Sequence, residues 1–347
     1  MRTAEHVDHA SLANWGAACL RAVGCSDDDA RTVADALVQT SLWGIDSHGI
    51  ARLPHYLARI RAGSIEPRPR YTVTRTAPGT AQFDGGHGLG IAAAFAAMAL
   101  AQTLAREAGI GAVGLCESTH CGAIGLYTRQ AARDGLVGIA FTHADSIVAP
   151  ARGTRKFLGT NPISIAFPRA GGAPLCLDMA TSAIPWNRVM NARREGHRLP
   201  PDVALDEHGR PTQDAHAATA LVPLGGVSYG HKGYALALMI DLLCGPLNGM
   251  AFADRIAPMF GDLTRRRRLG GLMIALDPAR FAGGAMLAQR VAEVVDAIRR
   301  QPGDVLYPGE PEERAEAQRR REGIPVEPGL RAEFDDWTRR LGVAPLR

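Results

Sequence analysis

The apolar positions of the chain follow two different periods. Apolar residues at helical spacing predict helices within residues 11–62 and over about 90–108, 125–134, 230–243 and 284–300. A charged helix pair, interrupted by two prolines, is predicted over 312–341. Short apolar or alternating runs predict strands at about 71–75, 111–116, 137–143, 175–179 and 271–276, with two further runs ending near 83 and 168. The strands all lie between residues 71 and 280, so we predict an α/β fold with a central mixed sheet.

Local signals mark the ends of the first long helix. Ser26 precedes three aspartates, and a serine side chain can accept a hydrogen bond from a first helical turn whose dipole acids stabilise. The helix is therefore predicted over about residues 28–42, before Gly44. Pro67 and Pro69 then separate this helical part from the first strand.

A glycine-rich segment, DGGHGLG at residues 84–90, precedes an alanine-rich helix. Its glycines have the spacing G-x-G-x-G. The strand before them is short and is followed by no clear βαβ unit with a ribose-binding acid. We therefore interpret the segment as a tight turn where helix and sheet backbones approach closely, and not as a dinucleotide-binding loop.

The segment between two helical runs, DSHGIAR at residues 46–52, carries unusual chemistry for a helix connection. A turn normally needs only Gly, Asn, Asp or Pro. A serine can orient an imidazole, an imidazole can transfer a proton near neutral pH, and an arginine can bind a carboxylate through two hydrogen bonds. The alternative is an Asx-type turn in which His48 is a solvated loop residue.

Polar residues of similar kind follow several predicted strands. Residues 118–127 read STHCGAIGLY, residues 159–162 read GTNP and residues 178–182 read DMATS. A small-residue loop that leads into a helix can bind an anion through backbone N–H groups, and ligands often collect at strand ends in α/β proteins. Each segment alone is equally typical of a capped turn beside the core.

In this order, four segments resemble signatures of the type 2 malate/L-lactate dehydrogenase family: DSHGxxR followed by LPxY, then SxHxGxxGxY, GTNP and DxATS. GHKGYAL at 230–236 and PG at 308–309 also match. The family comprises NAD(P)-dependent oxidoreductases that lack a Rossmann domain. The resemblance implies a non-Rossmann mixed-sheet NAD(P)-binding and catalytic domain over residues 71–280. It also implies a helical lobe formed from residues 1–70 and 281–347, and a homodimer.

The resemblance implies roles for individual residues. His48 would be the catalytic acid and base with Ser47 orienting its ring, while Arg52 would hold the substrate carboxylate together with Arg188 and Thr160. NADH or NADPH would be bound by His120, Cys121, Gly122, Ala123, Ile124, Thr160, Asp178, Met179, Ala180, His231, Lys232, Pro308 and Gly309. A lysine beside a helix start, such as Lys232, is otherwise simply solvated.

Arg188 departs from one branch of the family. The imine-reducing branch has an aspartate at this position, ten residues beyond the aspartate of DxATS, which helps to relay a proton. Other branches have Gly-Lys at about this point. A cation here would lower the pKa of a nearby imidazolium and could offer a second grip for a diacid or a bulkier anion. The departure therefore affects the expected substrate and the expected proton relay, and it leaves the cofactor assignment unchanged.

The predicted function is NAD(P)H-dependent hydride transfer to or from a small 2-oxo or 2-hydroxy acid, such as pyruvate or oxaloacetate. The alternative is reduction of a cyclic 2-imino acid such as piperideine- or pyrroline-2-carboxylate, and the sequence does not separate the two. A Ser-His hydrolase is disfavoured, because neighbours in sequence seldom place Oγ against Nε2 and there is no G-x-S-x-G elbow. A further alternative is an inactive homologue that binds the dinucleotide.

Composition and charge narrow the predicted partners and the predicted location of the protein. With 46% hydrophobic residues, 21% charged residues and a net charge of +4, the 347-residue chain is typical of a globular protein that does not bind nucleic acid. It has no apolar run long enough to span a bilayer and no secretory signal, so we expect no membrane partner and a cytoplasmic location. Six scattered cysteines lack metal-site spacing and predict reduced, mostly buried thiols. The four arginines at 265–268 are interpreted as a solvated loop, in preference to a role with an anionic ligand.

Overall fold

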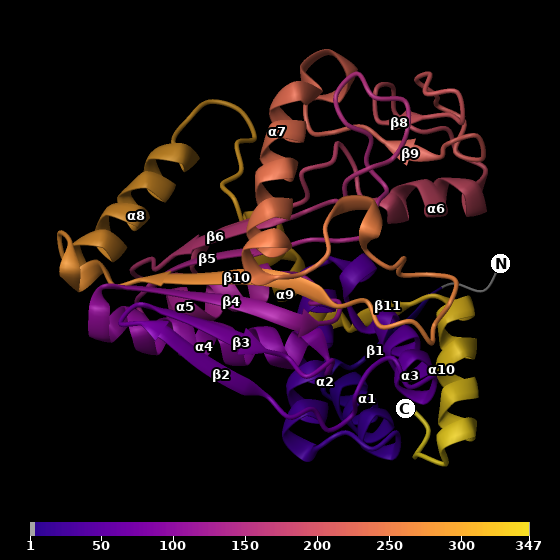
Figure 1. The fold of residues 1–347 in the computed structure, drawn as a ribbon, viewed down its shortest axis with the longest axis horizontal. Helices are drawn as coiled ribbons and strands as arrows, with labels where there is room; N and C mark the ends of the chain where they lie inside the picture. Colours follow the sequence, from indigo (N-terminus) through magenta and orange to yellow (C-terminus); the bar gives the residue numbers. More distant parts are fainter. Residues whose placement is uncertain (1–3, 347) are drawn as a thin grey trace.

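The computed structural model describes residues 4–346 and is organised around one mixed sheet (Figure 1). Its seven strands lie in the order β2-β3-β4-β10-β5-β6-β7. Only β3 and β4 run parallel, and every other neighbouring pair is antiparallel. A doubly wound dinucleotide fold is mostly parallel, so the predicted non-Rossmann mixed sheet is confirmed. The strands are β2 (Thr72–Ala77), β3 (Thr80–Asp84), β4 (Ile110–Ser118), β5 (Val137–Thr142), β6 (Ile163–Phe167), β7 (Leu175–Met179) and β10 (Leu269–Leu276).

Helices cover both faces of this sheet. α4 (Gly90–Ala108) and α5 (Gly125–Arg133) pack on one face, and α7 (Gly226–Cys244) packs on the other (Figure 1). α4 is rich in alanine, and Ala97 and Ala101 in its middle are completely buried. Small side chains let the helix lie close to the strands, so the core under α4 is thin and tightly packed.

The glycine-rich turn before α4 forms another close approach. A Cβ on Gly90 would lie 2.3 Å from the Thr119 carbonyl oxygen, which no side chain tolerates. The Gly90 N–H donates to Thr119 Oγ1 at 2.9 Å, and that hydroxyl donates to the Gly88 carbonyl at 2.9 Å. The interpretation of residues 84–90 as a tight turn is confirmed. The turn also fixes the backbone beside His120.

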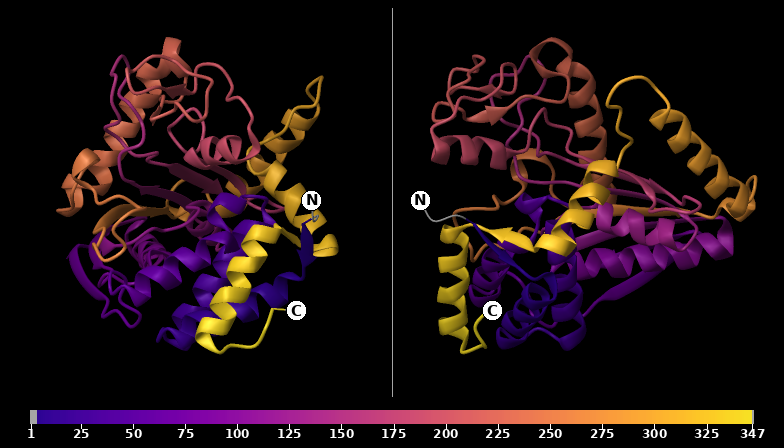
Figure 2. Two further views of the ribbon diagram at one scale, coloured as in Figure 1. Left: turned by 90° about the vertical axis from the view of Figure 1, so that its right-hand side faces the viewer. Right: turned by 180° about the vertical axis from the view of Figure 1, so that it is seen from behind.

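The two ends of the chain pack together as a helical layer. Its helices are α1 (His9–Ala22), α2 (Asp27–Leu42), α3 (Leu53–Arg61) and α10 (Pro328–Leu341). Figure 2 shows α10 beside the N-terminal helices. β1 (Glu5–Val7) pairs antiparallel with β11 (Ile324–Val326), and Trp15 Nε1 donates to Thr338 Oγ1 at 2.9 Å. Contacts between the first and the last residues therefore hold this part of the fold together.

The remaining C-terminal helices lie in different places. Trp43 Nε1 donates to a Glu316 carboxylate oxygen at 3.0 Å, which attaches α9 (Glu310–Glu322) to the end of α2. α8 (Gly284–Arg299) instead lies at the opposite end of the sheet from α10 (Figure 1). The division of the chain at residues 70 and 280 stays a prediction, and α8 lies away from the helices with which it was grouped.

A smaller unit with its own core stands next to α7. It contains α6 (Trp186–Glu195) and the short antiparallel pair β8 (Ala204–Leu205) and β9 (Ala220–Leu221). Its buried side chains include Val148, Ile184, Val189, Leu199, Val203 and Leu221. The sequence predicts no element here, because two-residue strands leave no periodic pattern and α6 buries only one narrow face.

Several local predictions can be compared directly with the structure. Ser26 is the N-cap of α2, and its Oγ accepts the Asp29 N–H at 3.1 Å, as predicted. All six cysteines are buried and free, which agrees with the expected reduced thiols. Across residues 4–346, no helix has both the length and the apolar character that crossing a bilayer requires.

Candidate active site

A tight turn between α2 and α3 carries the predicted catalytic residues. It consists of two short 3-10 segments, η1 (Asp46–His48) and η2 (Ile50–Arg52). Ser41 Oγ in α2 accepts the Ile50 N–H at 2.9 Å, and Arg319 in α9 donates to Asp46 Oδ2 at 2.9 Å. The turn is therefore attached to a helix on each side, which keeps its side chains in fixed positions.

His48, Ser47 and Arg52 form one connected group. The Ser47 hydroxyl and His48 Nδ1 share a hydrogen bond of 2.8 Å, and Arg52 Nε donates to the Ser47 carbonyl at 2.5 Å. Burial, together with the positive charge of Arg52, lowers the pKa of His48 to about 4. The imidazole is therefore neutral at pH 7, and its Nε2 is the nitrogen left to exchange a proton.

His120 lies face to face with His48. The two ring centroids are 5.5 Å apart, and the ring planes differ by 21°. His120 Nδ1 lies 2.7 Å from the Tyr56 hydroxyl oxygen and 3.3 Å from the Gly122 nitrogen. A backbone N–H can only donate, so Nδ1 is an acceptor and Nε2 carries the proton. Burial, and then the neighbouring basic groups, hold the pKa of His120 well below its usual value, so the ring is a neutral donor.

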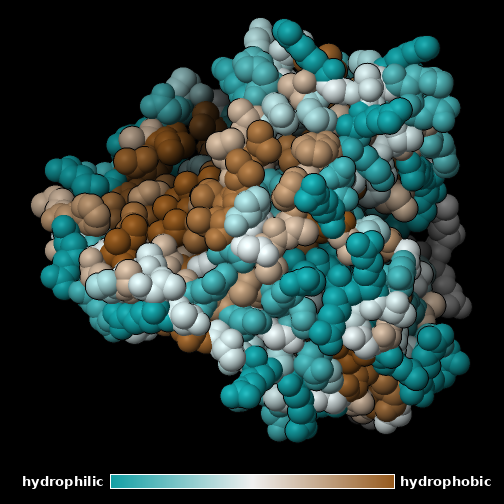
Figure 3. Space-filling model, in the orientation of Figure 1, coloured by the Kyte–Doolittle hydropathy of each residue, from teal (hydrophilic) through white to brown (hydrophobic). Residues whose placement is uncertain are grey.

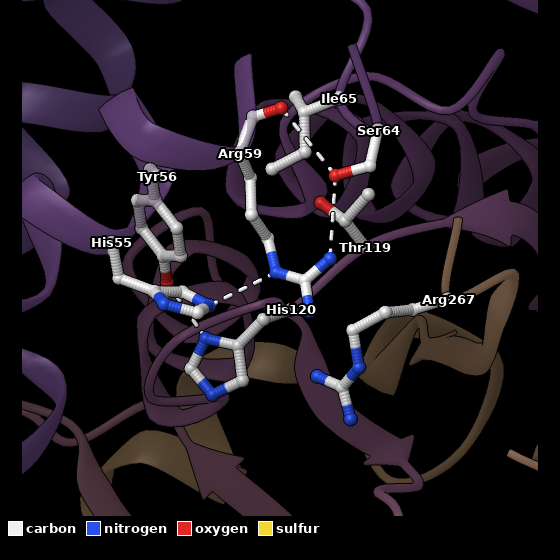
Figure 4. Close-up of a pocket in the computed structure, with 8 residues that line it drawn as sticks. All are labelled: His55, Tyr56, Arg59, Ser64, Ile65, Thr119, His120 and Arg267. Atoms are coloured by element: carbon white, nitrogen blue, oxygen red, sulfur yellow. Dashed lines mark hydrogen bonds between the residues drawn. The ribbon is translucent and has the colours of Figure 1, made fainter. Parts of the chain in front are cut away.

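A small cavity opens beside His120 (Figure 4). The space within it that a water centre can occupy is about 10 Å³, which is room for about one water molecule. Much of the polar lining comes from α3. The cavity is lined by His55, Tyr56, Arg59, Ser64, Ile65, Thr119, His120 and Arg267.

Arg59 fixes the loop that closes this cavity, residues 257–268. The Arg59 side chain is buried, and its hydrogen bonds go to His55 Nε2, Ser64 Oγ and the carbonyl oxygens of Pro258, Met259 and Arg265. A guanidinium has five N–H donors, so none is left for a ligand. Burial and the charge of Arg59 lower the pKa of His55 to about 4, and His55 is neutral as well. Arg59 is therefore a positioning residue.

The prediction that residues 265–268 form a solvated loop is wrong for Arg267. Its side chain is 3% exposed, its Nη2 pairs with Asp145, and its Nε donates to the Ala257 carbonyl at 3.1 Å. The remaining nitrogen, Nη1, is buried and has no hydrogen-bond partner within residues 4–346. The other three arginines of the run are exposed. Arg267 can be buried because the Asp145 carboxylate compensates its charge.

Arg52 reaches across to the smaller unit. Its Nη2 donates to Asn187 Oδ1 at 3.1 Å at the start of α6, and its guanidinium carbon lies 5.9 Å from the Phe260 ring centroid. Phe260 is 58% exposed, so it stands at the open side of the site. Arg188, predicted to contact the substrate, is exposed, and its side chain forms no hydrogen bond or ion pair with residues 4–346. Neighbouring side chains on a helix point about 100° apart, so only Asn187 faces Arg52.

Asp178 joins two of the predicted cofactor-binding segments. Its Oδ2 accepts the Gly125 N–H at 2.7 Å, at the start of α5 and directly after residues 120–124. A Cβ on Gly125 would lie 2.9 Å from the same oxygen, so only glycine allows this approach. Burial raises the pKa of Asp178 to about 6, while the Gly125 hydrogen bond and the charge of Arg129 oppose the rise.

The other predicted segments are attached to this region to different degrees. The Cys176 N–H in β7 donates to the Pro308 carbonyl at 3.3 Å, and the Thr160 carbonyl accepts the Thr181 N–H at 2.8 Å. Both segments therefore adjoin the strand that carries Asp178. Residues 231 and 232 are exposed on α7, and no described contact joins their side chains to the site. Their role in cofactor binding stays a prediction.

These groups fit a dinucleotide. The N–H groups of Gly122 and Gly125 are engaged by His120 and Asp178, so those of Cys121, Ala123 and Ile124 before α5 are the ones that suit phosphate oxygens. The Asp178 carboxylate suits ribose hydroxyls. Arg129 Nε is buried without a hydrogen-bond partner within residues 4–346, and it lies in the same region. When bound, the nicotinamide would supply or accept the hydride.

Several residues of the site had no role assigned from the sequence, among them His55, Tyr56, Arg59, Asn187 and Arg267. Tyr56 follows Arg52 by four positions, so helical spacing placed it on the same face. Arg267 lies two positions before the buried Leu269. In a strand, side chains two positions apart lie on the same face, so extending the strand pattern back to Arg267 would have predicted that it is buried too. No signal in the sequence marks Asn187.

The mixed sheet has strand-end loops that fit a dinucleotide. These loops lie next to an imidazole pair and an arginine that can hold a carboxylate. Together these features define an NAD(P)-dependent oxidoreductase of non-Rossmann type. The sequence profile of the malate/L-lactate dehydrogenase family matches residues 7–335. The chain belongs to this family. The predicted family, enzyme class and cofactor class are confirmed.

Relatives of similar length use either form of the cofactor. The chain is 38% identical over 312 residues to the (2R)-3-sulfolactate dehydrogenase (NADP(+)) of Chromohalobacter salexigens, covering 89% of this chain and 90% of that protein. It is 35% identical over 308 residues to the ureidoglycolate dehydrogenase (NAD(+)) of Escherichia coli K12, covering 87% of each.

Solved structures with the same fold include enzymes for two kinds of substrate. The sulfolactate dehydrogenase of Methanocaldococcus jannaschii superposes with a TM-score of 0.91 and 32% identity, over 98% of both chains. The Δ1-piperideine-2-carboxylate reductase of Pseudomonas syringae pv. tomato superposes with a TM-score of 0.87 and 29% identity, over 96% of this chain and 99% of that one. The fold is therefore shared by hydroxy acid dehydrogenases and an imino acid reductase.

Proposed function

We propose that this site transfers a hydride between NAD(P)H and carbon 2 of a small 2-oxo or 2-hydroxy acid, with His48 exchanging the proton. The observation that carries the proposal is the pair of facing imidazoles, His48 and His120, next to the Arg52 guanidinium. Reduction of a carbonyl requires a proton for the developing alkoxide and a cation for the neighbouring carboxylate. These side chains supply both.

His48 exchanges its proton at Nε2. In the oxidising direction, neutral His48 accepts the hydroxyl proton while the hydride leaves carbon 2 and the C=O bond forms. In the reducing direction, the imidazolium returns that proton to the same oxygen. Ser47 orients the ring through Nδ1. The Nε2–H of His120 donates a hydrogen bond to the substrate oxygen and stabilises the charge that develops there.

Arg52 holds the carboxylate next to carbon 2. The Ser47 carbonyl engages its Nε, and Asn187 engages one N–H of its Nη2. Three N–H groups of the guanidinium are left, and two of them can form parallel hydrogen bonds with a carboxylate. Asn187 and Ser47 therefore determine how the guanidinium fork is oriented.

The charges near the imidazoles favour an oxo acid over a cyclic imino acid. After burial, Arg59, Arg52 and Arg267 all lower the pKa of His55, which indicates a strongly positive environment. A protonated imine is a cation and would be repelled by the same arginines, whereas a 2-oxo acid would not. Similarity to a piperideine-2-carboxylate reductase makes imine reduction the second candidate.

A substrate panel tests the proposal. Purified protein is assayed for oxidation of NADH and of NADPH with pyruvate, oxaloacetate, piperideine-2-carboxylate and pyrroline-2-carboxylate. We expect turnover of a 2-oxo acid and little of either imino acid. Turnover of imino acids alone would move the assignment to the second candidate. Binding of NADPH without any turnover would indicate an inactive homologue.

The proposed active form is a homodimer. Figure 3 shows apolar residues gathered in a hollow between α7 and α8. Exposed apolar side chains on the two helices include Met239 and Leu242 of α7 and Met286 and Val294 of α8. A large exposed apolar patch typically marks a protein contact. Light scattering should give twice the mass of one chain, and the variant Leu242→Glu should shift the mass toward the monomer.

A cytoplasmic location stays a prediction, which cell fractionation tests.

A further inference from the structure

The turn that carries His48 is held from outside by the C-terminal helix α9. Both terminal nitrogens of Arg319 pair with the Asp46 carboxylate, and Nη1 also donates to the Ser41 carbonyl. Asp46 lies two positions before His48, and the Ser41 hydroxyl accepts the Ile50 N–H two positions after it. One guanidinium therefore contacts the turn directly on one side of His48 and supports it through Ser41 on the other side.

Further contacts between α9 and the end of α2 fix the position of Arg319. A Glu316 carboxylate oxygen accepts the Trp43 Nε1–H at 3.0 Å. A Cβ on Gly44 would lie 3.4 Å from the Ala315 Cβ, so the two helices are in direct contact there. Positions three and four apart lie on one face of a helix, so this face of α9 carries all three contacts. The Arg319 pair is therefore part of a helix–helix contact and not an isolated surface ion pair.

The other end of α9 begins at the predicted cofactor segment. Gly309 is the N-cap of the helix, and the Pro308 carbonyl accepts the Cys176 N–H of β7 at 3.3 Å. Arg319 lies about 15 Å further along the helix axis. Because successive backbone hydrogen bonds make a helix stiff, the two ends keep a fixed separation. α9 therefore supports the predicted cofactor segment at its start and the catalytic turn near its end.

Hydride transfer depends on that separation. The hydride and the proton must reach the two atoms of one C=O bond, and small displacements of either donor lower the rate steeply. His48 supplies the proton from the turn. The Asp46 carboxylate forms no hydrogen bond other than those with Arg319 within residues 4–346. Without Arg319, this part of the turn would lose its attachment to α9.

We propose that Arg319 is a positioning residue, which holds the His48 turn at the distance from the cofactor that hydride transfer requires. Its kinetic consequence rests on the proposed function, whereas its structural consequence can be measured without turnover. Arg319 acts through Asp46 and Ser41 and contacts neither the substrate nor the cofactor.

The test compares Arg319→Gln, Asp46→Asn and the double variant with wild type. With the 2-oxo acid that wild type reduces fastest, each single variant should lower kcat by about 5–50-fold, because a displacement of about 1 Å can cost about 100-fold. The Kd for NADPH, from fluorescence titration, should stay unchanged. Hydrogen–deuterium exchange measured by mass spectrometry should become faster in residues 44–53. The double variant should lose no more than either single variant, because all three break the same contact.

Two further variants serve as matched comparisons. Arg321 is exposed on the same helix. Arg321→Gln removes the same charge, and it should leave both kcat and the exchange of residues 44–53 unchanged. Arg319→Lys keeps the charge and loses the two-nitrogen pairing, so it should recover only part of the loss in kcat.

Thermal unfolding of each variant separates positioning from stability. A lower unfolding temperature in Arg319→Gln with unchanged kcat and unchanged exchange of residues 44–53 would overturn the proposal, and so would additive losses in the double variant. If Arg319→Gln does not fold, Asp46→Asn decides by the same measurements, since the Asp46 side chain is 52% exposed. If wild type turns over no 2-oxo acid, the proposed function has failed, and the exchange measurements alone decide whether Arg319 holds the turn.

Discussion

The turn that carries His48 and the loop that carries Arg267 reach the same region of the protein by different means. In the turn, the contacts are local, because Arg52 Nε binds the carbonyl of Ser47 and the Ser47 hydroxyl binds the adjacent imidazole. In the 257–268 loop, Arg267 is held by Asp145, which lies 122 positions earlier in the chain. The contacts among the three side chains of the turn are therefore local, although Arg319 and Asn187 also reach it. Arg267 is held by a distant segment.

This difference separates local contacts from long-range contacts at the site. His48, which we propose as the proton donor, and Arg52, which we propose to hold the carboxylate, both lie on the turn. Arg267, which is buried beside the cavity, lies on a loop. Loops tolerate sequence change more readily than packed elements. We therefore expect sequence changes to be tolerated more readily in the loop than in the turn.

The largest effect should come from removing the imidazole of the turn. His48→Ala should lower kcat by about 10²–10⁴-fold, because a positioned general acid and base contributes a factor of that order. NADPH binding, measured by fluorescence titration, should persist, since the predicted cofactor segments lie elsewhere. Unaltered turnover would remove His48 from its proposed role.

The next largest effect should come from the carboxylate clamp. Arg52→Gln should lower kcat/KM by about 10–150-fold for every 2-oxo acid, because each substrate loses a charge-assisted hydrogen bond. Arg52→Lys should recover only part of this loss, since an ammonium cannot form the bidentate pair. Steady-state kinetics with pyruvate and oxaloacetate measure the effect. A loss confined to oxaloacetate would contradict the proposal that Arg52 holds the carboxylate that all 2-oxo acids share.

A smaller effect, on stability, should come from the residue that ties the loop to α3. Arg59→Met leaves buried carbonyl oxygens of the loop without donors and should lower the free energy of unfolding by about 1–3 kcal/mol in urea titrations. Arg61, two positions later on α3, is exposed. Arg61→Met should therefore change stability little, and equal losses in the two variants would contradict the positioning role.

The smallest effect should come from pH near neutrality. Burial and then the charge of Arg52 lower the pKa of His48 to about 4, so the imidazole stays neutral until the pH falls through that value. The kcat/KM for oxidation of a 2-hydroxy acid requires the neutral ring, so it should be flat from about pH 8 to about pH 6 and fall below about pH 5. In Arg52→Gln, the loss of a positive charge should move that fall to higher pH. An inflection near pH 6.5 in wild type would contradict the lowered pKa.

Much of the sheet could be predicted from the sequence because its strands are long enough to show a period. The strand predicted over 175–179 has these bounds in the structure, and the helix predicted over 28–42 begins one residue earlier. β1 and β11 were not predicted, because a three-residue strand is too short to show a period and depends on pairing with its partner strand. α6, with its contact to Arg52, was missed for a similar reason.

The sequence by itself determined the family and the turn at residues 46–52, because residue types and short spacings are enough to specify local hydrogen bonds. Only the tertiary structure decided that His120 stacks on His48, that Asn187 and not Arg188 meets Arg52, and that one arginine of four is buried. Burial and charge proximity depend on which distant segments pack together. The pKa of His48 and the free donor of Arg267 follow from that packing, and no pattern along the chain encodes it.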